Sequence, residues 1–120
     1  MGDMRREGPK DERVVRKALL EVRITSDADR YVVAPSGELD SSTADLLEAE
    51  LDAVEWTGAH AVIIDLSGLS FMDSTGLRLV LITEARSRAD SNRLRLARGP
   101  RAVQRVFELA GIESRLPFID

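Results

Sequence analysis

The chain has 120 residues, the size of one domain, and 43% of them are hydrophobic, which is enough for a sizeable core. Cysteine is absent, so a disulfide framework and a thiolate metal site are excluded. His60 is the only histidine, so a transition-metal site would need an unusual set of carboxylates. The net charge of −4 and the 4% aromatic content argue against a nucleic-acid partner, because such a surface needs concentrated basic groups and stacking rings. No cofactor is expected.

The sequence predicts neither a membrane span nor a secretory signal. No segment approaches the roughly 18 consecutive apolar residues of a span, and the first 17 residues are dominated by charge. We therefore expect a cytoplasmic protein without a membrane partner. Residues 1–16 lack apolar periodicity until Val14, so we expect a flexible leader there and the folded domain over residues 17–120.

Two strands are expected first. Apolar and charged residues alternate over residues 19–25, which is typical of a half-buried strand. Residues 31–39 predict a second strand after a polar turn, and a hairpin connection would make the two antiparallel. Pro35 has no N–H to donate, so we expect it at a sheet edge or an irregularity.

A first helix is expected between Ser42 and Gly58, where apolar residues recur at helical spacing. Ser42 and Asp45 have the spacing of a capping box. Residues 61–66 then form a short apolar run that suits a central parallel strand. Asp65 interrupts this run, and we expect its carboxylate to accept backbone hydrogen bonds at the strand's end.

A second helix is predicted over residues 75–88, a fourth strand over residues 94–97, and a third helix from Pro100 to Gly111. The apolar tail 116–119 is expected to pack on the core. The order β-β-α-β-α-β-α predicts a single α/β domain with a mixed sheet of four or five strands and helices packed on it. In the second helix, the predicted buried side consists of Leu77, Leu81, Ile82, Ala85 and Ala89.

Ser74 is the first candidate site residue, because it stands where a polar turn opens the second helix. Unpaired N–H groups and the positive end of the helix dipole favour an anion there, such as a phosphate group carried by the serine itself. The alternative is an ordinary N-cap made by Asp73 or Ser74. Three capping-competent residues in a row, ending at Thr75, and a position beyond the carboxyl end of a strand favour a functional role.

Asp40 is the second candidate, at the end of the second strand. If the second and third strands are neighbours, Asp40 and Ser74 lie at the same sheet edge; the alternative for Asp40 is an N-cap of the first helix. A serine hydrolase using His60 is disfavoured, because His60 precedes the third strand and a G-x-S-x-G elbow is missing. The glycine-rich nucleotide-binding motifs are missing too.

Residues 62–77, VIIDLSGLSFMDSTGL, resemble the signature of STAS domains, specifically the bacterial anti-sigma factor antagonists. Residues 37–40 and 103–112 look like flanking elements of the same family. The resemblance covers residues 18–118. It implies a non-enzymatic regulator of transcription that acts by partner switching.

The implied partner is an anti-sigma factor, a serine kinase with bound ATP that sequesters a sigma factor. The unphosphorylated antagonist would bind this kinase and release sigma, and phosphorylation of Ser74 would switch the antagonist off. A metal-dependent serine phosphatase would reset it. The same resemblance also fits a scaffold subunit of a stress-signalling or lipid-transport complex. The residues expected to contact the partner are Asp40, Asp73, Ser74, Thr75, Gly76 and Leu79, with a partly buried flank position as the alternative for Leu79.

Overall fold

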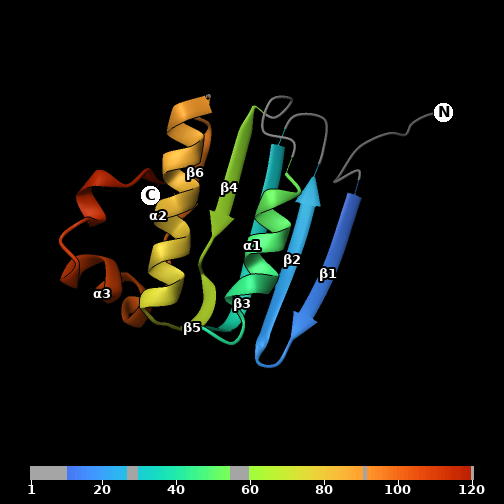
Figure 1. Ribbon diagram of the computed structural model, residues 1–120, viewed down its shortest axis with the longest axis horizontal. Helices are drawn as coiled ribbons and strands as arrows, with labels where there is room; N and C mark the ends of the chain where they lie inside the picture. Colours follow the sequence, from blue (N-terminus) through green and yellow to red (C-terminus); the bar gives the residue numbers. More distant parts are fainter. Residues whose placement is uncertain (1–10, 27–29, 55–59, 91, 120) are drawn as a thin grey trace.

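The computed structural model describes residues 11–26, 30–54, 60–90 and 92–119, which form one mixed β-sheet with helices on it (Figure 1). The strands are β1 (Asp11–Lys17), β2 (Leu20–Ser26), β3 (Arg30–Leu39), β4 (Ala61–Asp65), β5 (Gly68–Met72), β6 (Leu94–Ala97) and β7 (Phe118–Ile119). The helices are α1 (Ala44–Asp52), α2 (Ser74–Asp90) and α3 (Arg101–Leu109), and a 3-10 helix spans Glu113–Arg115. The predicted element order is present, and β1, β5 and β7 are additional strands.

The sheet has the strand order β1-β2-β3-β4-β6-β7, and β5 pairs with β3 beside that path. The pairs β1–β2 and β2–β3 are antiparallel, which confirms the predicted hairpin. All other pairs are parallel. Helices α1 and α2 lie across one face of the sheet, and α3 lies to the left of the lower end of α2 in the view of Figure 1.

Alternation along the strands places one set of aliphatic side chains beneath α1 and α2, as period-2 geometry requires. Leu47 and Leu51 of α1 and Phe107 of α3 complete this core. Of the opposite residues of β2, Arg23 is exposed, and Glu21 and Thr25 are half-buried. The buried strand residues are Leu20, Val22, Ile24, Val33, Val62, Ile64, Leu94 and Leu96.

The expected boundary at residue 17 is wrong, because residues 11–16 belong to β1. This strand pairs with β2 along its whole length. Its sequence lacks a clear apolar pattern because its helix-side contacts are charged: Lys17 Nζ lies 2.8 Å from a carboxylate oxygen of Asp45, and Arg13 pairs with Glu50, both on α1. Residues 1–10 of the expected leader lie outside the described residues.

Strand β5 was predicted as a turn, but it extends the sheet. β4 pairs with the first half of β3, residues 30–33, and β5 pairs with the second half, residues 36–39. Pro35 lies between these two stretches, where β3 has no parallel partner, so its predicted place at an irregularity is confirmed. Asp65 ends β4, and its Oδ1 accepts the N–H of Ser67 at 3.0 Å, also as predicted.

The predicted buried face of α2 is only partly confirmed: Leu77 packs against the core and Leu81 is half-buried, but Ile82, Ala85 and Ala89 are exposed. Ile82 is 52% exposed, and the covered residues are Gly76, Leu79, Val80, Thr83 and Ser87. The two hydroxyl side chains can be buried because they are hydrogen-bonded: Thr83 donates to the Leu79 carbonyl at 2.8 Å, and Ser87 accepts the N–H of Leu94 at 2.9 Å. Gly76 faces the sheet, and the apolar residues Ile82, Ala85 and Ala89 face outward.

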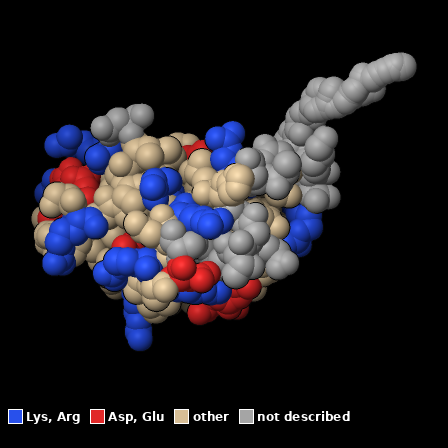
Figure 2. Space-filling view, turned by 90° about the horizontal axis from the view of Figure 1, so that it is seen from above, with Lys and Arg blue, Asp and Glu red and all other residues tan. Residues whose placement is uncertain are grey.

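Figure 2 shows the end of the molecule at which β4 begins. On this end the described Lys and Arg side chains are interspersed with Asp and Glu instead of forming one broad basic field. None of the helices in the described ranges is long and apolar enough to cross a membrane.

Candidate functional site

The loops that follow β3 and β5 meet at one edge of the sheet. Leu39 and Met72, the last residues of these strands, are ladder partners. The N–H of Asp73 donates to the Leu39 carbonyl at 3.2 Å, so Asp40 and Asp73 follow two directly paired positions. The structure therefore brings Asp40 to the turn that carries Ser74, although the adjoining strand is β5 and not β4.

Asp73 is the N-cap of α2. Its Oδ1 accepts the N–H of Thr75 at 2.9 Å, and its carbonyl accepts the N–H of Leu77 at 3.2 Å. Ser74 is thus the first helical residue, and it is exposed. Its hydroxyl makes no hydrogen bond within the described part of the chain. Because Asp73 does the capping, the Ser74 hydroxyl is left available at the positive end of the helix dipole.

Asp73→Ala is expected to lower the free energy of unfolding by about 1 kcal/mol, since the Thr75 N–H loses its acceptor. Urea denaturation followed by circular dichroism measures this change. Asp73→Asn keeps a capping oxygen and should retain most of the stability. Equal stability of the alanine variant and the wild type would contradict the assigned cap.

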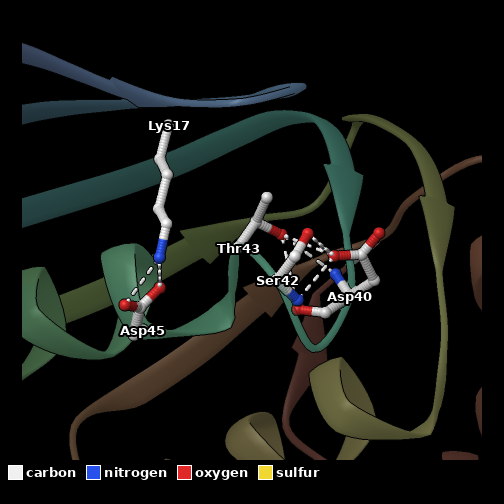
Figure 3. Close-up of polar contacts among 5 residues, drawn as sticks. All are labelled: Lys17, Asp40, Ser42, Thr43 and Asp45. Carbon is white, nitrogen blue, oxygen red and sulfur yellow. Dashed lines mark hydrogen bonds and ion pairs between the residues drawn. The ribbon is translucent and has the colours of Figure 1, made fainter.

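Asp40 closes the turn before α1 (Figure 3). Its Oδ1 accepts the backbone N–H of Ser42 at 2.9 Å, the Ser42 hydroxyl at 2.7 Å and the Thr43 hydroxyl at 3.3 Å. The other carboxylate oxygen points away from these two residues in Figure 3. The Ser42 hydrogen bonds, followed by those of Thr43, hold the pKa of Asp40 below its ordinary value of 3.8, so the site carries this negative charge at neutral pH.

Neither expected cap of α1 forms. The N-cap residue is Thr43, which makes no side-chain capping bond, so Asp40 is not the cap. The predicted capping box between Ser42 and Asp45 is also wrong, because the Ser42 hydroxyl donates to Asp40 and Asp45 pairs with Lys17 instead. The hydrogen bond from Lys17 is the main cause that lowers the pKa of Asp45. The polar groups before α1 therefore shape the turn and leave the second Asp40 oxygen without a bond to Ser42 or Thr43.

Gly76 and Leu79 lie largely inside the domain. A Cβ on Gly76 would stand 2.5 Å from Met72 Cγ and 2.8 Å from Leu39 Cδ2, so only glycine lets α2 approach the strand ends this closely. Leu79 is 7% exposed. Burial gives both residues a packing role, and their contact with a partner stays a prediction.

Sequence reasoning missed a shallow groove between α1 and α2, beside Ser74. It has a volume of about 250 Å³ and is lined by Ala44, Glu48, Thr75, Arg78, Leu79 and Ile82. It also missed Phe71, which precedes Ser74 by three residues and is 46% exposed. The only sign of Phe71 in the sequence was an apolar residue next to the motif, and the sequence alone does not tell whether such a residue is exposed or buried in the core.

The described residues include no group of three or more His, Cys, Asp or Glu side chains placed to hold a metal ion. His60 directly precedes β4, whereas Ser74 follows the carboxyl end of β5, which runs parallel to the same strand β3. A histidine-assisted nucleophile is therefore not assembled at Ser74. What the geometry offers is an exposed hydroxyl flanked by two carboxylates.

Comparison with known proteins identifies the fold and the motif together. The STAS domain model matches residues 20–120. The chain belongs to the STAS domain family. This STAS domain is 38% identical over 91 residues to an anti-sigma-B factor antagonist of Staphylococcus epidermidis, a match that covers 75% of the chain and 82% of the relative. The anti-sigma-B factor antagonist of Staphylococcus aureus NCTC 8325 is 30% identical over 94 residues, with 78% and 87% covered.

Solved structures share the architecture. An anti-sigma factor antagonist from Mycobacterium paratuberculosis superposes with a TM-score of 0.73 at 27% identity, covering 82% of this STAS domain chain and 84% of the other. The antagonist SpoIIAA in its unphosphorylated form gives 0.66 at 22% identity, covering 92% and 87%. The latter likeness shows the fold alone. The resemblance read from residues 62–77 and the mixed α/β fold are both confirmed.

Proposed function

We propose that this protein is an anti-sigma factor antagonist that Ser74 phosphorylation switches off. The unphosphorylated form binds an anti-sigma factor serine kinase, and the bound kinase no longer holds its sigma factor. The relatives at 30–38% identity, which are named anti-sigma-B factor antagonists, support this class of function. The observation that carries the proposal is the exposed Ser74 hydroxyl, which Asp73 frees from capping α2.

The chemistry proposed for Ser74 is a phosphoryl transfer catalysed by the partner. The Ser74 oxygen attacks the γ-phosphorus of the kinase-bound ATP, the bond to the β-phosphate oxygen breaks, and ADP leaves. A base on the kinase accepts the hydroxyl proton. The antagonist supplies the acceptor and no catalytic group, which makes it a non-enzymatic regulator. A metal-dependent serine phosphatase then hydrolyses the phosphoserine and restores the binding form.

Electrostatics explain why the modified form would leave the kinase. Phosphoserine brings a charge of roughly −1.5 to −2. The N–H groups at the start of α2 stabilise this negative charge by only about 1 kcal/mol. Asp40 and Asp73 already make the surface negative, so the added charge repels acidic groups and nucleotide phosphates that face it. Each pair of unit charges about 4 Å apart costs on the order of 1–4 kcal/mol, depending on the effective dielectric.

Intact-mass measurement tests the site. A serine kinase retained on immobilised Ser74→Ala protein is purified and incubated with the wild type and ATP, and a gain of one phosphate is expected. Ser74→Ala should gain none. Ser67→Ala, which removes an exposed hydroxyl in the β4–β5 turn, is the matched control and should be phosphorylated like the wild type. A phosphate gain that survives Ser74→Ala would refute the assigned acceptor.

A further inference from the structure

The outward side of α2 carries exposed apolar residues beyond Ser74. Ile82 is 52% exposed, and Ala85 and Ala89, which follow it along the same line of the helix, are exposed too. Ile82 borders the α1–α2 groove, whose other apolar members are Ala44 and Leu79. No described segment of the chain covers this surface.

The α1–α2 groove has the composition of a binding surface. Three of its lining residues are apolar, and the other three, Glu48, Thr75 and Arg78, are polar. Apolar centres with polar rims are typical of protein–protein interfaces. Glu48 and Arg78 are exposed and carry opposite charges, so they can orient a partner that presents the complementary pair.

The groove lies within reach of any protein that docks over Ser74. Ile82 is eight residues further along α2, which is about 12 Å along the helix axis. A stable interface covers about 800 Å² of each partner, equivalent to a disc of about 16 Å radius. A footprint centred on Ser74 therefore extends over Ile82 and the groove.

Ser74 itself is poorly suited to supply the affinity of such a complex. The residues that dominate binding energy are usually large side chains that fill pockets at the centre of an interface, and serine is under-represented among them. The groove and Ile82 offer the apolar contact that Ser74 lacks. Switching and affinity are thus carried by different residues of the same helix.

We infer that the α1–α2 groove binds an apolar side chain of the kinase that phosphorylates Ser74, and that Ile82 is the main contact. This inference rests on the proposed function. A second copy of the chain is disfavoured as occupant, because a copy docked on Ile82 would extend over Ser74 by the same footprint argument and block its phosphorylation. The groove determines which kinase is recognised, and the phosphate determines whether it stays bound.

Ile82→Glu is the decisive variant. Calorimetric titration of the purified ADP-bound kinase should show that this variant binds at least tenfold more weakly than the wild type. With ATP, the kinase should phosphorylate the variant with a raised KM and little change in kcat. Ile82→Leu keeps an apolar side chain and should bind like the wild type. Leu109→Glu, the same kind of change at a 75% exposed position of α3, is the matched control and should have no effect. Thermal unfolding should be unchanged in all three.

The outcomes separate this inference from the proposed function. Wild-type affinity of Ile82→Glu, together with normal Ser74 phosphorylation, would overturn the groove assignment and leave the switch intact. Failure of the kinase to phosphorylate the wild type would overturn both. If sedimentation shows a wild-type dimer that Ile82→Glu dissociates, the occupant is a second copy and the assignment to the kinase is wrong.

Discussion

Phosphorylation of Ser74 is expected to weaken kinase binding by roughly 30- to 150-fold, which corresponds to about 2–3 kcal/mol of repulsion. Ser74→Asp adds one charge instead of nearly two, so we expect about a tenfold loss for this variant. Ser74→Ala should bind as tightly as the unphosphorylated wild type. Calorimetric titration of the ADP-bound kinase measures all four forms under one set of conditions.

Two controls isolate the charge. Ser74→Asn matches aspartate in size without its charge, so it should bind nearly as well as the wild type. The loss caused by Ser74→Asp should also shrink at high salt, because exposed charges are screened within about 3 Å at 1 M ionic strength. If asparagine weakens binding as much as aspartate does, bulk and not repulsion is the cause.

The largest effect on stability is expected from Gly37→Ala. Gly37 has a φ of +99°, and a Cβ there would stand 2.1 Å from the carbonyl oxygen of Leu19. The positive φ alone costs a side-chain-bearing residue about 1–2 kcal/mol, and overpacking adds about 1–3 kcal/mol. We therefore expect Gly37→Ala to lower the free energy of unfolding by about 3 kcal/mol, measured by urea denaturation.

Gly111→Ala is a matched control for this loss. Gly111 also has a positive φ, +74°, but its added Cβ would meet nothing within 4 Å. It should show the conformational cost of about 1–2 kcal/mol without the clash. Equal losses at Gly37 and Gly111 would mean that the clash with the Leu19 carbonyl adds nothing to the conformational cost of the substitution.

The elements with a clear apolar period were predictable from sequence, and those formed by non-local pairing were not. β2 and β4 follow alternation or a continuous apolar run, so their positions were predicted closely. β1 was missed because its helix-side contacts are ion pairs from Arg13 and Lys17, which look like a solvated terminus in sequence. β5 was missed because it pairs with residues 36–39 of β3, which β4 leaves unpaired, and the sequence does not show where β4 stops pairing.

The orientation of α2 shows where periodicity is insufficient. Its sequence contains two plausible faces, and counting apolar residues favours the one with Leu81 and Ile82. The structure turns the helix so that Gly76, Leu79, Val80, Thr83 and Ser87 are buried while Leu77 stays on the core's edge, because Gly76 permits contact with the strand ends and the hydroxyls of Thr83 and Ser87 are hydrogen-bonded.

At the site, the motif around Ser74 could be recognised in the sequence, and so could its acidic neighbours Asp40 and Asp73. The sequence did not decide which of Asp73 and Ser74 caps α2, because both residue types are favoured N-caps. That decision depends on one side-chain hydrogen bond, from the Thr75 N–H to Asp73. The exposure of the Ser74 hydroxyl therefore could not be predicted from the sequence.

The close packing of Gly76 against Leu39 and Met72 holds the start of α2, and with it Ser74, firmly in place. The backbone bond from Asp73 to Leu39 fastens the same point to the sheet. A loosely attached helix would relieve added charge by tilting and would keep its partner. Because the first turn of α2 is packed against the strand ends, we expect the repulsion from a phosphate on Ser74 to weaken the complex and not to tilt the helix.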